Sequence, residues 1–136
     1  MKKLIIIILL FSVFSCTTDT KSLSNVEVAK RYMEAIVKLD YKTAKKYASK
    51  EEFNSKKMGI DFLNFKGIDD YEFKMIKDSI NGNISWIEYE DFISSKPVSM
   101  KLEKDSERGW IVVPRKDNEK SFFVKHIKFP TRKPVK

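Results

Sequence analysis

The chain is poor in the residue types that build disulfides, metal centres and phosphate-binding loops. Its 136 residues include one cysteine and one histidine, so an internal disulfide and a zinc site made of cysteine and histidine are both excluded. The four glycines form no phosphate-binding loop, and no serine lies in the GxSxG motif of a hydrolase. These absences predict a protein without a bound metal or other cofactor.

The remaining composition is typical of one small, water-soluble domain. Hydrophobic residues make up 42% of the chain, which is enough for a packed core, and charged residues make up 34%. A chain of this length builds one core of modest size. The sequence has no internal repeat, and its four prolines and four glycines are too few for a low-complexity chain.

The only cysteine, Cys16, comes shortly after the longest apolar run. Lys2 and Lys3 precede this run, which extends from Leu4 to Phe14 with one interruption at Ser12. The run has about half of the ~20 residues that cross a bilayer as a helix. A short apolar run after a basic start is typical of a secretory signal peptide.

The residues around the cysteine indicate the kind of signal. Val13-Phe14-Ser15-Cys16 resembles the bacterial lipobox, in which a cysteine after a small residue becomes the acylated first residue of the mature chain. Several acyl chains on Cys16 would hold the protein firmly at a membrane, because a single chain binds only marginally. Phe14 is bulkier than the usual residue at its position. The alternative is an ordinary signal peptide, or a short anchor, that contains a cysteine by chance.

These features predict the organisation and location of the chain. We expect a lipoprotein signal peptide over residues 1–15, a flexible polar tether over 16–22, one domain over 23–129 and a loose basic C-terminus over 130–136. The protein is then lipid-anchored in a bacterial cell envelope, where nucleic acid is not an expected partner. Thr17, in place of an aspartate, favours the outer membrane over the inner membrane.

Three capping signals predict three helices in the first half of the domain. Ser24 with Glu27, and Ser49 with Glu52, have the spacing of a capping box, and Asp40 is placed to cap a helix between them. Apolar residues recur at steps of three and four residues over 26–39, 41–48 and 53–63. We expect the third helix to stop at Gly67.

Alternating apolar residues predict an antiparallel sheet in the second half. We expect strands over residues 71–75, 84–93, 98–102, 110–113 and 121–129. Asn81-Gly82 is the favoured hairpin turn between the first two strands. The alternation slips between Trp86 and Ile87, which predicts a bulge there. Residues 110–113 are apolar on both faces, so this strand should be central or well covered.

The order of elements and two segments carry a resemblance to a known family. In "AIVKLDYKTAKKYAS" an apolar helix end, an Asp-aromatic pair and an alanine-spaced second helix follow without a gap, and "SERGWIVV" has a charged turn, Gly, Trp and valines. From residue 24 to 113 the chain resembles the NTF2-like (cystatin-like cone) superfamily, and within it small bacterial lipoproteins of the DUF4878 kind. The resemblance implies an α+β fold in which N-terminal helices pack on a curved antiparallel sheet. It implies no single activity, because the superfamily includes isomerases, dehydratases, transport factors and domains without known chemistry.

Aromatic residues are the candidates to line a pocket in such a cone. They are Tyr32, Tyr47, Trp86, Tyr89 and Trp110. The alternative is that they fill the core, as large aromatics do in most small domains. An isomerase-like site would need a buried carboxylate with a raised pKa beside Tyr32 or Tyr47. The acids Glu88, Glu90 and Asp91 alternate with Tyr89 in a way that is typical of an exposed strand face.

The net positive charge of the mature chain lies in its last segment. Residues 16–114 contain 17 basic and 17 acidic residues, whereas residues 115–136 contain eight basic and two acidic residues, a net charge of +6. The basic residues are Arg115, Lys116, Lys120, Lys125, Lys128, Arg132, Lys133 and Lys136. We predict that this patch contacts anionic lipid headgroups or an acidic partner. The alternative is a solvated tail that keeps the protein soluble.

Three functions are compatible with the sequence. The first is a cell-envelope lipoprotein whose non-catalytic domain binds a small apolar ligand or a protein partner. The second is a small enzyme of the isomerase or hydrolase type, which uses a carboxylate and a tyrosine in the cone. The third is a structural homodimer that packs sheet to sheet and has no pocket.

Overall fold

The chain folds into helices followed by an antiparallel sheet, which confirms the α+β class. The computed structural model describes residues 19–116 and 119. Its elements are η1 (Thr20–Ser22), α1 (Asn25–Val37), α2 (Tyr41–Ala44), α3 (Lys50–Phe62), β1 (Met75–Asn81), β2 (Ile84–Glu90), β3 (Pro97–Asp105) and β4 (Gly109–Val113). The expected signal peptide, Cys16, the strand over 121–129 and the basic residues from Lys120 onward lie outside the described residues.

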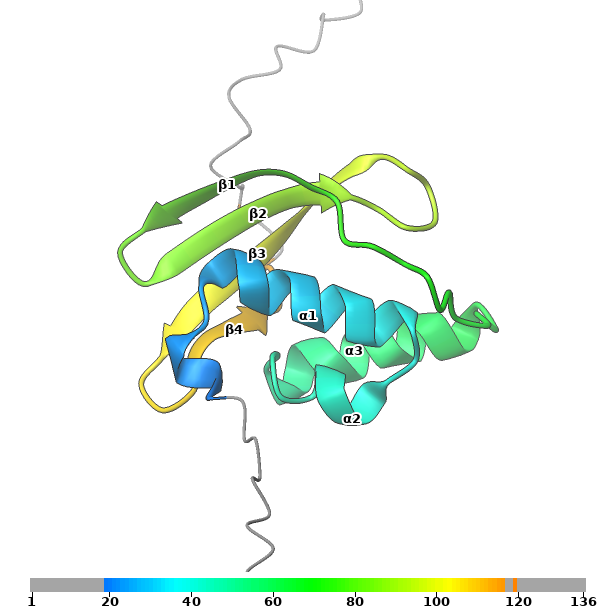
Figure 1. The fold of residues 1–136 in the computed structure, drawn as a ribbon, viewed down its shortest axis with the longest axis horizontal. Coiled ribbons are helices and arrows are strands. Elements are labelled where there is room, and N and C mark those ends of the chain that lie inside the picture. The colour runs from blue at the N-terminus through cyan, green and yellow to red at the C-terminus, as the bar shows by residue number, and fades with distance from the viewer. Residues whose placement is uncertain (1–18, 117–118, 120–136) are drawn as a thin grey trace, which may run out of the picture.

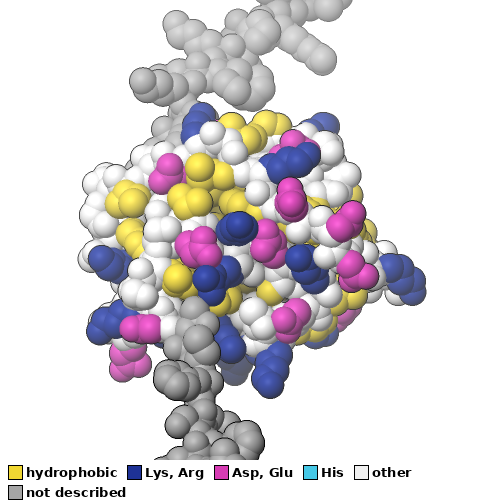
Figure 2. All heavy atoms as spheres, in the orientation of Figure 1, with side chains coloured by type: hydrophobic (Ala, Val, Ile, Leu, Met, Phe, Trp, Pro, Cys, Tyr) yellow, Lys and Arg dark blue, Asp and Glu magenta, His cyan; other side chains and the backbone are white. Residues whose placement is uncertain are grey.

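The four strands form one curved, open sheet in the order β1-β2-β3-β4, and the helices form a second layer. Helix α1 lies along the inner face of the sheet, and α2 and α3 lie on the far side of α1 from β1 (Figure 1). Lys, Arg, Asp and Glu side chains are interspersed over the face of the domain that Figure 2 shows. None of the described helices has both the length and the apolar composition to cross a membrane.

Each helix begins at the residue that the sequence predicted. The side chains of Ser24, Asp40 and Ser49 accept hydrogen bonds from backbone N–H groups three residues later, at 3.1, 3.1 and 3.2 Å. The predicted end of the third helix at Gly67 is wrong. Helix α3 ends at Phe62, and Asn64 has a left-handed φ of 49° that turns the chain away from the helix axis.

The core lies between α1 and the inner face of the sheet. One face of α1 is completely buried, and it contributes Val28, Ala29, Tyr32, Met33 and Ile36. The sheet contributes Ile87, Tyr89, Met100, Leu102, Trp110 and Val112 to the same cluster. Burying side chains of this size stabilises a fold by about 1.5–3 kcal/mol each, so the contact between α1 and the sheet is the main source of stability.

The hairpin between β1 and β2 is confirmed, but three details of the sheet differ from the prediction. Strand β2 ends at Glu90 rather than at residue 93. Strand β1 begins at Met75 rather than at residue 71, and the bulge lies in β1, between Met75 and Lys77. Strand β2 pairs with β3 without interruption, so the bulge predicted between Trp86 and Ile87 is wrong. Both residues are buried because both faces of the sheet are covered at this point, and the slip in the alternation reflects that cover.

Strand β4 lies at an edge of the sheet, but this edge is covered. The N–H of Val112 donates to the carbonyl of Tyr47, and the N–H of Ser49 donates to the carbonyl of Val112, both at 2.8 Å. Residues 47–49, between α2 and α3, thus extend the sheet by one parallel bridge. The prediction that residues 110–113 form a well-covered strand is confirmed. The alternative, a central position in the sheet, is not, because the only neighbour of β4 on its outer side among the described residues is the short loop over residues 47–49.

The segment expected to be a tether has its last three residues in η1, which packs against the turn between β3 and β4. Gly109 has a φ of 76°, and a Cβ atom there would lie 2.9 Å from the carbonyl oxygen of Lys21. Only glycine allows this close approach and this backbone conformation together. The position at which the chain leaves the domain toward Cys16 is therefore fixed.

A buried polar contact attaches the start of α1 to the sheet. The side-chain amide of Asn25 donates to the hydroxyl of Ser85 in β2 at 2.9 Å and to the carboxylate of Asp78 in β1 at 3.2 Å. Asn25 and Ser85 are both buried. The contact satisfies polar groups that would otherwise be left unpaired among apolar side chains.

We predict that Asn25→Ala lowers the free energy of unfolding by about 1–3 kcal/mol, because it leaves the Ser85 hydroxyl without its partner. Urea denaturation of the mature chain measures the change. The control is Asn54→Ala, which removes an exposed asparagine of α3 and should change stability by less than about 0.5 kcal/mol. An equal effect of the two substitutions would contradict the assigned role of Asn25.

Candidate functional site

Four of the five aromatic residues proposed for a pocket are brought together, and the fifth is not. Tyr32, Tyr47, Tyr89 and Trp110 belong to the core cluster and are at most 8% exposed. Trp86 lies on the outer face of the sheet, where the guanidinium of Arg115 is 5.9 Å from its ring centroid. The four side chains are part of the packed core, and two of them also line hollows: Tyr89 lines one of about 90 Å³, and Tyr47 lines one of about 280 Å³ beside α1.

The acids of β2 face away from this core. Glu88 pairs with Lys77 at 2.9 Å and Glu90 pairs with Lys74 at 3.3 Å. Asp91, in the loop after β2, accepts hydrogen bonds from the N–H and the hydroxyl of Ser94 at 2.9 and 2.8 Å. Burial alone would raise the pKa of Asp91, but these hydrogen bonds outweigh it and hold that pKa below its ordinary value.

A surface groove of about 390 Å³ lies between α3 and the loop that joins β2 to β3. Helix α3 contributes Glu52, Ser55, Lys56, Gly59 and Ile60, its C-cap residue contributes Leu63, and the loop contributes Asp91, Phe92 and Ile93. We call it the α3 groove. Leu63 and Ile93 are each 59% exposed at its sides, so the groove has apolar walls that are open to solvent.

A smaller pocket of about 90 Å³ adjoins the inner end of the α3 groove, and Glu52 and Lys56 line both. Its other walls include Tyr89, Ser99 and Met100, and we call it the inner pocket. Glu52 and Lys56 are four residues apart on one face of α3. The apolar groove therefore ends at a polar point formed by one acid and one base.

At the inner end of the α3 groove the pKa values of Glu52 and Tyr32 are both raised. Burial raises the pKa of Glu52, while the charge of Lys56 opposes that rise. Burial, and then the charge of Glu52, raises the pKa of Tyr32. The Tyr32 hydroxyl is buried and forms no hydrogen bond of full geometry among the described residues, but it lies close enough to Glu52 to lower the pKa of that carboxyl in part. Glu52 thus keeps its proton to a higher pH than an exposed glutamate, and the protonated form offers both a hydrogen-bond donor and an acceptor to a ligand.

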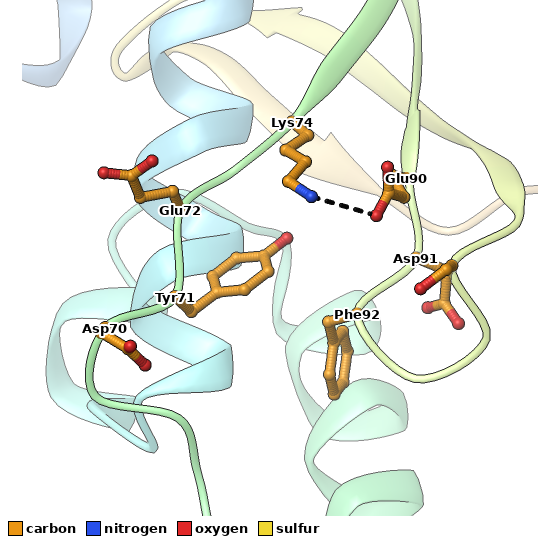
Figure 3. Close-up of a pocket in the computed structure, with 8 residues that line it drawn as sticks. Asp70, Tyr71, Glu72, Lys74, Glu90, Asp91 and Phe92 are labelled. Atoms are coloured by element: carbon orange, nitrogen blue, oxygen red, sulfur yellow. Dashed lines mark hydrogen bonds and ion pairs between the residues drawn. The ribbon is translucent and has the colours of Figure 1, made fainter.

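Another hollow, of about 290 Å³, shares Asp91 and Phe92 with the α3 groove. Figure 3 shows that the carboxylates of Asp70, Glu72 and Asp91 point in different directions around it, and that Lys74 spans it to Glu90. Over residues 19–116 and 119, no cluster of three acidic, histidine or cysteine side chains is arranged to hold a metal ion.

The first residues of the predicted basic patch have structural partners. Arg115 donates from Nε to the carbonyl of Glu119 at 2.7 Å and stacks over Trp86. The N–H of Lys116 donates to the Glu119 carboxylate at 3.3 Å. The six other residues of the patch lie beyond the described part of the chain, so their contact with lipid or with a partner stays a prediction.

Comparison with models of protein families, with curated proteins and with solved structures finds no match to this chain.

Glu52 is the site residue that the sequence did not reveal. Its spacing from Ser49 marks it as part of a capping box, and its backbone N–H does take part in that cap. The only further signal is its helical register with Lys56, Gly59 and Leu63, which places it on the face that lines the groove. Nothing in the sequence indicates that Tyr32 packs close to it.

We predict that the Glu52 carboxyl titrates above the ordinary glutamate value of 4.5. Between that value and its own pKa the folded state binds more protons than the unfolded state, so stability falls as pH rises through this window. A carbon-13 NMR titration of the side-chain carboxyls measures the pKa, and the spectrum of Glu52→Gln identifies the resonance. A midpoint at or below 4.5 would contradict the prediction.

Proposed function

We propose that this chain is a lipid-anchored protein of the bacterial cell envelope, on the outer rather than the inner membrane, and that its domain is of the NTF2-like kind found in DUF4878-type lipoproteins. Helices followed by a curved, open antiparallel sheet support that fold family. The proposed function is non-catalytic binding of a small apolar ligand that carries one polar group. The site is the α3 groove.

The proposal is based on one observation: the lining of the α3 groove changes from apolar at its outer walls to polar at its inner end. The outer walls expose Leu63 and Ile93, and the inner end holds Glu52 with a raised pKa. A volume of about 390 Å³ lies within the range of small-molecule sites, which are mostly apolar with a few polar groups that fix orientation. A ligand with an apolar body would lie along the walls and direct its polar group to Glu52.

A proton-transfer enzyme is the second candidate, and one observation favours it. Glu52, with its raised pKa, lies near the buried hydroxyl of Tyr32, which is the acid and tyrosine pair that such an enzyme needs. Tyr32 and Tyr89 are at most 4% exposed, however, and the adjoining inner pocket holds only about 90 Å³. This volume is too small for a substrate to reach both groups, so ligand binding is the better-supported function.

A dimer that packs sheet to sheet has less support. On the outer face of the sheet Trp86 is 1% exposed and Ile111 is 7% exposed within a single chain. A second copy would find little apolar surface there to bury, and stable dimers bury large apolar areas. The apolar side chains that do remain exposed near the α3 groove suit a ligand or a protein partner at that end of the domain.

We predict that Gly59→Leu abolishes binding of the neutral fluorophore N-phenyl-1-naphthylamine without lowering stability. Gly59 lines the α3 groove, and a Cβ atom there meets nothing within 4 Å, so a leucine side chain enters the groove without a clash. A helix gains up to about 1 kcal/mol when an internal glycine is replaced by a better helix former. Fluorescence titration measures the binding, and thermal unfolding measures the stability.

The matched control is Met58→Leu, which changes an exposed neighbour on α3 that does not line the α3 groove. It should bind the fluorophore like the native protein. If Gly59→Leu binds equally well, the α3 groove is not the ligand site.

The anchor is tested separately. We expect Cys16→Ser to move the protein from the membrane fraction to the soluble fraction, because it removes the thiol that would carry the acyl group. Intact-mass measurement of the native protein should show an N-terminal acylated Cys16. An unmodified Cys16 in the mature protein would overturn the lipoprotein assignment.

A further inference from the structure

A cationic hollow lies at the end of the domain where the chain leads back toward Cys16. Its volume is about 320 Å³, and its walls include Lys45, Ser49, Lys50, Phe53, Asn54 and Arg108. We call it the tether-side hollow. These residues come from the junction of α2 with α3 and from the turn between β3 and β4, so the fold assembles them from two distant parts of the chain.

The walls of the tether-side hollow carry positive charge, and a neighbouring carboxylate that interacts with them, Asp105, lies outside the hollow and accepts from the backbone N–H of Arg108 at 2.9 Å. The walls contain three basic side chains and no carboxylate. Among the described residues none of the three forms an ion pair. Arg108 is held in place by donation to the carbonyl of Ala48 at 3.2 Å, and the Lys45 ammonium lies 5.3 Å from the ring centroid of Phe53. Glu51 and Glu107 neighbour these cations in sequence, but neither lines the hollow.

The tether-side hollow and the exit of the chain are adjacent. Arg108 precedes Gly109, whose Cα hydrogen faces the backbone of Lys21 in η1. Lys and Arg side chains are visible along the lower edge of the domain in Figure 2, which is the edge where η1 lies in Figure 1. Arg108 therefore lies next to the exit point, and it also lines the tether-side hollow.

The distance from η1 to Cys16 is short. Cys16 is three residues before Asp19, the first described residue, and an extended chain spans at most about 3.6 Å per residue. The Cα atoms of the two residues therefore lie within about 11 Å of each other. An acylated Cys16 would keep η1, and with it the tether-side hollow, within reach of the lipid headgroups.

We infer that the tether-side hollow binds the phosphate group of an anionic lipid in the membrane to which Cys16 anchors the chain. The inference rests on the proposed acylation of Cys16 for its location. Its chemistry rests on the hollow itself: a guanidinium binds phosphate through two parallel N–H groups, and two ammonium groups add charge. The hydroxyl of Ser49 and the amide of Asn54 supply further donors for phosphate oxygens.

The test measures binding of the mature chain, residues 16–136 with Cys16→Ser, to vesicles of phosphatidylcholine with one-third phosphatidylglycerol. Without an acyl chain, binding reports the protein surface alone. We expect Lys45→Gln and Lys50→Gln each to weaken binding about fivefold, the share of one basic residue near an anionic surface. The control, Lys96→Gln, removes the same charge from the loop at the opposite end of β3 and should weaken binding less than twofold.

A second measurement identifies the source of the phosphate. In an NMR titration with sn-glycerol 3-phosphate, the amides of Ser49, Lys50 and Asn54 should shift in the native chain and not in Arg108→Gln. Suppose that these amides shift in the native chain, while Lys50→Gln binds the vesicles as strongly as the native chain does. The ligand is then a free phosphorylated molecule, and the lipid inference is overturned. If Lys96→Gln weakens vesicle binding as much as Lys50→Gln does, the attraction is diffuse and the hollow is not a site. The fluorophore and Cys16 experiments are independent, so a failure here is distinct from a failure of the proposed function.

Discussion

The burial of Tyr32 against the sheet is the contact on which the rest of the structure depends. Its ring lies at the centre of the buried face of α1 and joins the helix to the sheet residues of the core. Its hydroxyl is buried, and among the described residues it interacts with the Glu52 carboxyl. The same hydroxyl lies near Glu52, so the packing that stabilises the fold also places a polar point at the inner end of the α3 groove.

The loop that lines the α3 groove and the turn that contacts η1 lie at opposite ends of β3. Its nine residues run from Pro97, beside the loop that lines the α3 groove, to Asp105, near the turn that contacts η1. At about 3.3 Å for each of the eight steps between these residues, the two ends of β3 are about 26 Å apart. The α3 groove and the tether-side hollow are closer together than this, because consecutive residues of α3 line them: Glu52 lines the groove, and Phe53 and Asn54 line the hollow.

Local sequence signals predict where the helices begin, but they do not predict which residues become buried when the helices and the sheet pack together. The side chains of Ser24, Asp40 and Ser49 cap helices because a cap depends on residues within one turn. The bulge was misplaced because Trp86 and Ile87 are both buried, and alternation cannot distinguish a bulge from a sheet that is covered on both faces. The spacing of Glu52 from Ser49 indicates a cap, but it does not indicate the burial that raises the pKa of Glu52, because that burial depends on tertiary packing.

On the outer face of the sheet a basic side chain is already paired with acids. The number of basic residues in the sequence therefore overestimates the positive charge that is free to bind a partner. Lys101 is 4% exposed there and pairs with Glu119 at 2.7 Å and with Glu103 at 3.0 Å. Burial alone would lower the pKa of Lys101, but the two carboxylates outweigh it and raise that pKa. Removing either carboxylate would leave part of a buried charge uncompensated, which is costly. Glu119 is one of two acids in the basic segment, and together with Arg115 it packs over the outer face of the sheet. Lys45 and Lys50, in contrast, form no ion pair among the described residues and line the tether-side hollow.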